Sequence, residues 1–179
     1  MDAADSAGGV AFLTESKYGW DWHGDVLRLT LLKSPLSPDS TADRGHHEFR
    51  FAILPHAGDY RAAGIVQRAG EYNVPMLASV QPSHPGALGH STSLVSVDAP
   101  NVEVTWVKRA EDSNALVLRL VEWGGRPATA TVTLSSHIRA AHLANLLEDP
   151  GAALQPSGNR LRVTLRPFEI ATILVDLDR

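Results

Sequence analysis

Alternation of apolar and polar residues constrains the fold of this sequence more than any other feature. Successive side chains of a β-strand point to opposite faces, so a period of two gathers the apolar side chains on one face. Segments of this kind, separated by turn-forming residues, lie at residues 26–32, 49–53, 102–106, 116–120, 130–134, 161–165 and 168–177. Short strands at this spacing, without the regular helices of a parallel sheet, predict an all-β chain with an antiparallel sandwich.

Two of these segments also predict which side chains share a face. Phe51 and Ile53 belong to the apolar face of the second segment, and Ala52 points the other way. In the third segment Val102 and Trp106 point in the same direction. We therefore expect Trp106 to be a packing residue of the sandwich.

Three stretches interrupt the strand pattern. Residues 34–45 are rich in proline and aspartate and predict a polar loop. Residues 61–72 place apolar side chains at helical spacing and predict a short helix. Residues 81–93 carry prolines and glycines with almost no periodicity, which is typical of a linker. The resulting division is an N-terminal part at 1–80, a linker at 81–101 and a terminal β-sandwich at 102–179.

The composition excludes several classes of protein and partner. Hydrophobic residues make up 44% of the chain and charged residues 20%, so the chain can bury a core and is not disordered. A formal net charge of −4 gives no electrostatic reason to bind nucleic acid or a membrane, and neither is expected as a partner. Cysteine is absent, and residues 1–9 lack the basic and apolar regions of a signal peptide, so we expect a cytoplasmic location.

No residue pattern predicts a catalytic centre. The sequence contains no glycine-rich phosphate loop, nucleophile elbow or His-Glu-x-x-His motif. His46 and His47 would point to opposite faces of a strand, and His56 lies further along the chain, so we expect no metal site. A glycosidase needs two carboxylates across a cleft, but Asp39, Asp43 and Glu48, in or near one loop, are better explained as solvated turn residues.

Trp20 and Trp22 form the one aromatic pair whose spacing suggests a role. If residues 20–23 are extended, both rings lie on the same face of the strand. A flat pair of rings can stack on the apolar face of a sugar. Packing in a core or at a domain interface is the alternative, and it is the commoner use of such rings.

An ordered set of motifs resembles the C-terminal region of family 38 glycoside hydrolases, the α-mannosidases. The motifs are GVAFL (9–13), SKYGWD (16–21), GDVLRLTLLKSP (24–35), DRGHHEF (43–49), LPH (54–56), NLLE (145–148) and LRPFEI (165–170). Their order and spacing resemble the bacterial and cytosolic branch of that family. The resemblance covers nearly the whole chain and implies that residues 1–80 are the last strands of a mutarotase-like β-super-sandwich, followed by a small antiparallel β-sandwich.

The resemblance implies a C-terminal accessory part of a retaining, zinc-dependent α-mannosidase that acts on mannose-containing glycans. In that family an N-terminal domain holds the zinc ion and the catalytic aspartates, and no stretch of this sequence matches them. The chain alone is therefore expected to be inactive, with no catalytic residue and no cofactor of its own; zinc is expected in the missing catalytic domain. The expected partners are that domain or a second copy of the chain, and carbohydrate.

The same resemblance places the turn at Lys17 and Tyr18 and the loop at Asp43 and Arg44 near the sugar cleft. Together with the tryptophan pair, the predicted substrate-proximal residues are Lys17, Tyr18, Trp20, Trp22, Asp43 and Arg44. The family often has Tyr or Phe at the position of Trp20, and it commonly has Gln at the position of Arg44. A stand-alone carbohydrate-binding module that uses the tryptophan pair, or a structural β-sandwich, is the alternative function.

Strands taken from the end of a larger sandwich lack some of their neighbours. The segments at 26–33 and 48–54 are therefore expected to leave apolar side chains exposed, among them Leu27 and Phe51. We expect this half of the chain to associate with a catalytic partner or with itself, or else to stay partly disordered.

Overall fold

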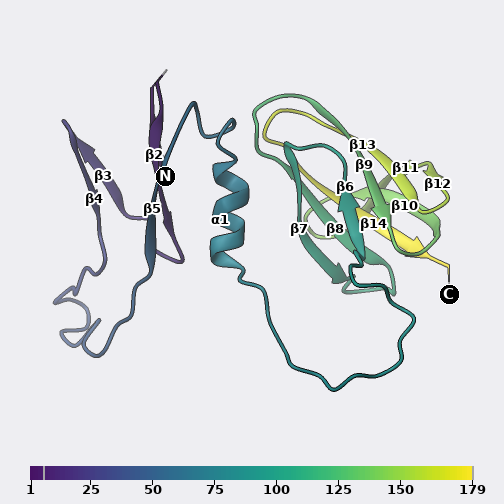
Figure 1. Ribbon diagram of the computed structural model, residues 1–179, viewed down its shortest axis with the longest axis horizontal. Coiled ribbons are helices and arrows are strands. Elements are labelled where there is room, and N and C mark those ends of the chain that lie inside the picture. The colour runs from purple at the N-terminus through teal and green to yellow at the C-terminus, as the bar shows by residue number, and fades with distance from the viewer. Residues whose placement is uncertain (6, 179) are drawn as a thin grey trace. The chain divides into compact units, whose positions relative to one another are not determined.

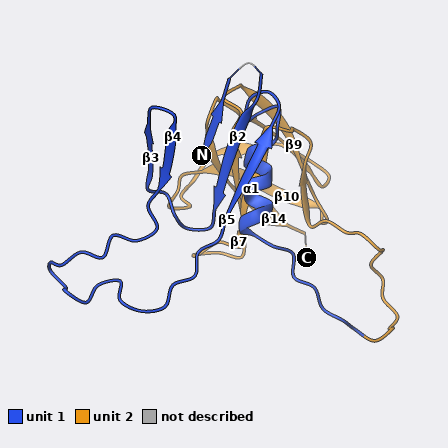
Figure 2. Ribbon diagram, turned by 60° about the vertical axis from the view of Figure 1, so that its left-hand side comes forward, with its two compact units in different colours: residues 1–81 blue, residues 82–179 orange. Residues whose placement is uncertain are grey.

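The computed structural model describes residues 1–5 and 7–178, and the chain divides into two compact units at residues 1–81 and 82–179 (Figures 1 and 2). Every strand pair in the described residues is antiparallel, and one short helix accompanies the strands. The prediction of an all-β chain is confirmed.

The first unit contains a three-stranded sheet, a separate hairpin and a helix. Its elements are β1 (Asp2–Ala4), β2 (Gly9–Thr14), β3 (Trp20–His23), β4 (Val26–Leu29), β5 (Phe51–His56) and α1 (Ile65–Asn73). The sheet has the strand order β1-β2-β5, and β3 pairs only with β4 among the described residues. Both sheets are small, so they bury little on their own.

Helix α1 packs against one face of the three-stranded sheet. Ala11 and Leu13 of β2 are buried together with Ile65 of α1. The predicted helix at 61–72 is confirmed, although it begins four residues later than expected. Gly64 lies directly before it with a φ of 62°, a left-handed conformation that glycine adopts without steric cost.

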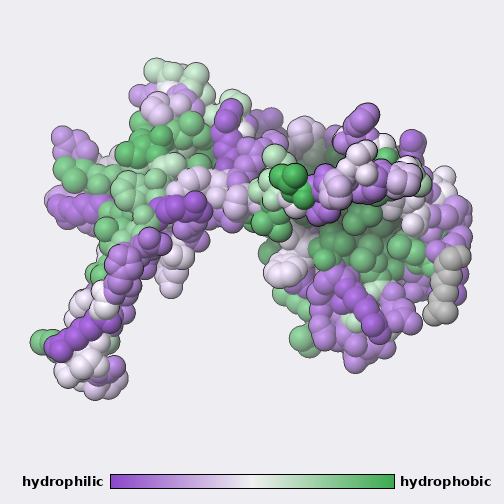
Figure 3. All heavy atoms as spheres, turned by 60° about the horizontal axis from the view of Figure 1, so that its bottom comes forward, coloured by the Kyte–Doolittle hydropathy of each residue, from purple (hydrophilic) through white to green (hydrophobic). Residues whose placement is uncertain are grey.

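The opposite face of this sheet carries exposed apolar side chains. Phe51 is 53% exposed and Ile53 is 58% exposed, whereas Ala52 and Leu54 pack against the cluster under α1. The alternation in β5 is therefore as predicted, and its larger apolar side chains lie on the uncovered face. Hydrophobic residues are visible over this unit in the space-filling view (Figure 3).

A nearly buried pair of titratable groups ties β5 to β1. His56 Nε2 lies 2.6 Å from Asp2 Oδ1, and the two side chains are 6% and 15% exposed. Gly9 leaves room for the imidazole, since a Cβ at this position would lie 2.8 Å from Cε1 of His56. The hydrogen bond to Asp2 raises the pKa of His56 above its ordinary value of 6.5 and outweighs burial, which acts in the other direction.

We expect the first unit to become less stable as the pH rises from about 6.5 through the folded-state pKa of His56. A raised pKa means that the stabilisation by His56 is fully present below about pH 6.5 and is lost as the pH rises through the higher folded value. An NMR titration of the His56 ring should give a midpoint above the ordinary value. His56→Gln should remove the pH dependence of the opening free energy of β5, obtained from amide exchange after correction for the intrinsic exchange rates, while the matched loop variant His47→Gln should retain it. An unchanged pH dependence in His56→Gln would contradict this assignment.

The segment between α1 and β6 (Val95–Val97) contains no helix or strand. Met76, Leu77 and Val80 are between 98% and 100% exposed, so the segment buries almost nothing. The predicted linker at 81–101 extends too far toward the C-terminus, because β6 lies inside that range and pairs with β9 (Ala128–Leu134). The sandwich thus begins before residue 102.

Limited proteolysis should cut this segment first. Exposed backbone without hydrogen-bonded structure is the preferred site of cleavage. Chymotrypsin should therefore cleave after Leu77 or Leu88, which is 80% exposed, and should leave a stable fragment of the second unit. Replacing both leucines with serine should slow this cut. Initial cleavage inside β9 would contradict the boundary.

The second unit is a sandwich of two antiparallel sheets. In addition to β6 and β9, its strands are β7 (Val102–Arg109), β8 (Leu116–Glu122), β10 (Ile138–Ala144), β11 (Pro150–Leu154), β12 (Pro156–Ser157), β13 (Arg160–Leu165) and β14 (Ile170–Leu177). The strand orders are β11-β10-β14-β8-β7 and β12-β13-β9-β6. The predicted small terminal sandwich is present.

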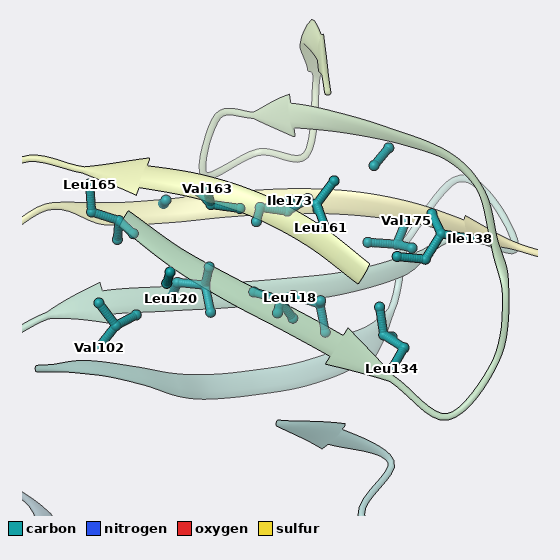
Figure 4. Packing of buried hydrophobic residues seen from close by; sticks show 14 of the residues in the cluster. Val102, Leu118, Leu120, Leu134, Ile138, Leu161, Val163, Leu165, Ile173 and Val175 are labelled. Atoms are coloured by element: carbon teal, nitrogen blue, oxygen red, sulfur yellow. The ribbon is translucent and has the colours of Figure 1, made fainter. Parts of the chain in front are cut away.

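Its core is formed by inward-facing side chains from both sheets (Figure 4). Leu118 and Leu120 of β8, Ile173 of β14, and Leu161 and Val163 of β13 are at most 2% exposed. These residues alternate with exposed or half-buried ones along β13, as the period of two predicts. The sandwich therefore has an apolar core of its own.

A bulge in the edge strand β7 changes the orientation predicted for Trp106. Val104 pairs with Leu120 but Trp106 pairs with Arg119, so Thr105 is an extra residue without a counterpart on β8. One extra residue moves all later side chains to the other face of the strand. Val104 packs against the core, whereas Trp106 is 61% exposed on the opposite face. The expectation that Trp106 packs in the sandwich is wrong.

Glu122 is a fully buried carboxylate at the end of β8. Its Oε1 accepts hydrogen bonds from Asn101 Nδ2 (2.7 Å) and the Gly124 N–H (2.6 Å). Its Oε2 accepts from the N–H groups of Gly125 (2.9 Å) and Phe168 (2.8 Å). Burial raises the pKa of Glu122, but these hydrogen bonds outweigh it and hold the pKa below its ordinary value. One carboxylate thus fastens the end of β8 to the turn that follows it and to the turn before β14.

Candidate functional site

All six residues predicted to lie near a sugar belong to the first unit. Lys17 and Tyr18 lie between β2 and β3, Trp20 and Trp22 lie on β3, and Asp43 and Arg44 lie in the loop between β4 and β5. Because these are three separate segments, the contacts between them decide which residues can act together.

The turn before β3 is held at Lys17 and displays Tyr18. Thr14 Oγ1 donates a hydrogen bond to the Lys17 carbonyl at 2.6 Å. The Lys17 ammonium lies 4.6 Å from the centre of the Phe49 ring, a cation–π distance. Tyr18 is 92% exposed, so its ring is available to a ligand.

The long loop between β4 and β5 is organised around Asp43. Asp43 has a φ of 59°, and its Oδ2 accepts a hydrogen bond from the Ser34 N–H at 3.0 Å. His47 Nε2 lies 2.9 Å from the Asp43 carbonyl oxygen. The His47 ring stacks on Phe49 with the ring centres 5.9 Å apart. Asp43 and Lys17 are therefore joined through His47 and Phe49.

The tryptophan pair lies on an extended strand, as predicted, but the two rings differ in their surroundings. The Trp20 ring is half-buried and lies 5.6 Å from the Phe12 ring at an angle of 56°. Trp22 is 50% exposed, and its Nε1 donates to the Gly24 carbonyl at 2.7 Å. Trp20 thus serves packing, and Trp22 is the ring that remains open to a ligand.

The structure brings some of the predicted residues together and leaves others apart. The contacts that join Lys17 to Asp43 do not include Tyr18, Trp22 or Arg44. Arg44 is exposed on the same loop as Asp43. The site that can be described is therefore a group formed by Lys17, Phe49, His47 and Asp43, with exposed polar and aromatic residues on either side.

His47 and Phe49 organise this group, and neither was predicted to do so. In the sequence, His47 stands out only as a candidate metal ligand and Phe49 only as part of an apolar strand face. The spacing of His47 four residues after Asp43 is a weak local signal for their contact. The contact of Lys17 with Phe49 has no signal in the sequence, because the whole β3–β4 hairpin and its loop lie between them.

The carboxylates of this unit are arranged as hydrogen-bond acceptors. Arg50 donates to Glu15 and lowers its pKa, and the hydroxyl and N–H of Thr41 lower the pKa of Asp39. A glycosidase acid requires the opposite, a raised pKa. Within residues 1–5 and 7–178, no three His, Cys, Asp or Glu side chains lie close enough to hold a metal ion. No helix within these described residues is long and apolar enough to cross a membrane.

Two family models match the chain in order. Residues 1–41 match the C-terminal domain of glycosyl hydrolases family 38, and residues 101–173 match the C-terminal beta sandwich domain of the same family. The two matched ranges fall in the first and second unit of the structure.

Curated relatives carry names from the same group of enzymes. Human alpha-mannosidase 2C1 is 41% identical over 182 residues, which is 99% of this chain and 17% of the relative. An alpha-mannosidase of Saccharomyces cerevisiae is 31% identical over 96% of this chain and 18% of the relative. The chain thus spans less than a fifth of the length of these relatives.

Solved structures show the same fold. The crystal structure of an alpha-mannosidase from Enterococcus faecalis matches 98% of this chain with a TM-score of 0.75 and 21% sequence identity. The matched part is 20% of that protein. At this level of identity the comparison establishes the arrangement of strands.

Proposed function

This chain belongs to the C-terminal region of glycosyl hydrolase family 38, and from that membership we propose that it is the accessory C-terminal part of an α-mannosidase. The proposed enzyme hydrolyses mannose-containing glycans with retention of configuration, depends on zinc and works in the cytoplasm. The observation that carries the proposal is 41% identity to an alpha-mannosidase along 99% of the chain.

The proposed role of the first unit is to complete a larger sandwich. Its three-stranded sheet leaves Phe51 and Ile53 exposed on one face, and β5 has a free edge in the described residues. Burying one such side chain stabilises an association by about 1.5–3 kcal/mol. The partner we propose is the catalytic part of the same enzyme, with a second copy of this chain as the alternative partner.

The proposed contact with sugar is the group of Lys17 and Asp43, together with the exposed Tyr18, Trp22 and Arg44. Ammonium, guanidinium and carboxylate groups can bind sugar hydroxyls, and an aromatic ring can cover an apolar sugar face. The described residues of this chain do not assemble a zinc site, so no step through zinc is assigned to them. Zinc and the nucleophile belong to the catalytic part in this proposal.

A stand-alone carbohydrate-binding module is the second candidate. The half-exposed Trp22 favours it, because this ring lines an open depression of about 670 Å³ with small residues of β1 and β2. A module of this kind would bind sugar without any catalytic partner.

A chimera tests the first candidate. This chain replaces the matched region of human alpha-mannosidase 2C1, and hydrolysis of an aryl α-mannoside is measured with added zinc. We expect activity in the chimera and none in this chain alone, because the chain offers no acid and nucleophile pair. The chimera with Phe51→Asp and Ile53→Asp should lose activity or solubility, while the matched variant with Asp112→Asn should keep both.

Two outcomes would contradict the proposal. Hydrolysis by the purified chain alone, abolished by a substitution within the chain, would show a catalytic centre of its own. A soluble, zinc-loaded chimera without activity would show that this chain cannot serve as the accessory part.

A further inference from the structure

The outer face of the five-stranded sheet holds a cavity that the proposed function does not use. Its volume is about 370 Å³, within the range of about 300–1,000 Å³ that is usual for small-molecule sites. It is lined by Trp106, Lys108, Glu111, Val117, Arg119 and the loop residues 146–148. All of these belong to the second unit, so the cavity is complete within the terminal sandwich.

The strand register gathers these side chains on one face. Trp106 of β7 lies opposite Arg119 of β8, and Arg119 lies opposite Thr172 of β14. Arg119 Nε donates to Thr172 Oγ1 at 3.4 Å, which holds the guanidinium along this row. In the neighbouring row Lys108 lies opposite Val117. The bulge at Thr105 produces this arrangement, because in a regular strand of the same sequence Thr105 would pair with Arg119, and Trp106 and Lys108 would point into the core. Bulges of this kind are a recurrent means of redirecting a side chain toward a site.

A preformed turn between β10 and β11 closes one side of the cavity. Asn145 Oδ1 accepts hydrogen bonds from the N–H groups of Leu147 (2.9 Å) and Asp149 (3.0 Å). The turn holds Leu146 and Leu147 outward, where they are 63% and 83% exposed. It also places Glu148 inward with a φ of 70° and a side chain that is 11% exposed. Two exposed leucines beside an exposed tryptophan give the cavity an apolar wall.

The polar groups of the cavity compensate one another in charge. Lys108 forms ion pairs with Glu111 and with Glu148, the latter at 2.8 Å. Glu148 Oε2 also accepts a hydrogen bond from the Glu111 N–H at 2.9 Å. Two cationic and two anionic side chains leave no net charge to attract an ion. Their remaining donors and acceptors, and the terminal N–H groups of Arg119, suit a neutral ligand with several hydroxyl groups.

From this geometry we infer that the terminal sandwich carries a carbohydrate-binding pocket, in which a sugar ring lies on Trp106 and its hydroxyl groups bind Arg119, Lys108 and Glu148. An aromatic ring beside fixed hydrogen-bonding groups matches the two kinds of surface on a pyranose, an apolar face of C–H groups and the hydroxyl groups around the ring. The choice of an α-linked mannose oligosaccharide as the ligand rests on the proposed function; the pocket itself does not.

An NMR titration of the full chain tests this inference. With an α-linked mannotriose as the probe, the indole N–H signal of Trp106 and the amide signals of β7 and β8 should shift. Trp106→Ala should abolish the shifts in β8, and Arg119→Met should weaken binding by about tenfold through loss of a charged donor. Trp22→Ala, a matched change in the first unit, should leave binding at this pocket unchanged. Amide protection in β8 and β14 checks that each variant keeps its fold. We expect Trp106→Ala to keep it, because Trp106 lies outside the core.

A comparison of mannotriose with cellotriose distinguishes failure of this inference from failure of the proposed function. Cellotriose binding with the same dependence on Trp106, without mannotriose binding, would support the pocket and argue against the mannosidase assignment. Shifts that depend on Trp22 alone, or no shift with either sugar in a folded chain, would overturn the pocket.

Discussion

Replacing Glu122 with glutamine is expected to lower the free energy of unfolding of the terminal sandwich by about 3 kcal/mol. The glutamine amide keeps one acceptor oxygen, so two of the four donors around Glu122 would face an NH₂ group and lose their partner. A buried donor without an acceptor costs about 1–3 kcal/mol. For a domain of this size the unfolding midpoint should fall by roughly 4–8 °C for each kcal/mol.

Chemical denaturation of the full chain, followed by the methyl signals of Val163 and Ile173, measures this effect in the second unit. Asp112→Asn is the matched control, because it makes the same change of charge at an exposed turn residue. It should change stability by less than about 0.5 kcal/mol. Equal effects of the two substitutions would show that the hydrogen bonds of Glu122 do not stabilise the sandwich.

The lowered pKa of Glu122 also predicts how the stability of this unit changes when the pH is lowered. Its stabilising contribution is present above the ordinary glutamate value of 4.5 and is lost as the pH falls through the lower folded-state pKa. The loss on acidification should be smaller in Glu122→Gln than in the unchanged chain.

Amide hydrogens of β2 and β5 are expected to exchange at least about 100-fold faster than those of β8 and β14 in the unpartnered chain. Among the residues that the structure describes, fifteen buried side chains form the main core of the second unit and three form the core of the first, so local opening of the first unit costs much less free energy. Hydrogen exchange followed by mass spectrometry of the full chain gives both rates in one sample.

Two variants show whether the difference arises from the separate cores. Ile65→Ala should accelerate exchange in β2 and β5 and leave β8 unchanged. Leu161→Ala should do the reverse, accelerating exchange in β8 and β14. Strong and equal protection of both units would mean that the first unit is stable without a partner, and the proposed completion of a larger sandwich would lose its physical basis.

The sequence predicted the terminal sandwich well because its strands obey a local rule. Leu118 and Leu120, or Leu161 and Val163, alternate without interruption and are all buried. Glu122 lies two residues after Leu120 on β8, so its side chain points to the same inward face. This place in the alternation is the signal that the sequence offers for a buried carboxylate. Its partners come from distant turns such as the one at Phe168, which periodicity does not reveal.

Prediction failed where one residue or a distant contact decided the outcome. Thr105 adds no unusual composition to its segment, yet the bulge at this residue reverses Trp106. The start of the sandwich was placed too late because the three residues of β6 are too few to show a period. In the candidate site, the contact of Lys17 with Phe49 depends on how a long loop returns to β5.

The bulge in β7 also has a consequence for how homologous sequences are aligned and how they diverge. Deleting the single codon for Thr105 would restore an unbroken ladder with β8. Trp106 would still pair with Arg119 and Lys108 with Val117, so both side chains would stay on the outer face. A homologue that lacks this residue therefore keeps the same two faces, and its alignment needs a gap at Thr105; an alignment without that gap would compare interior positions of one protein with surface positions of another.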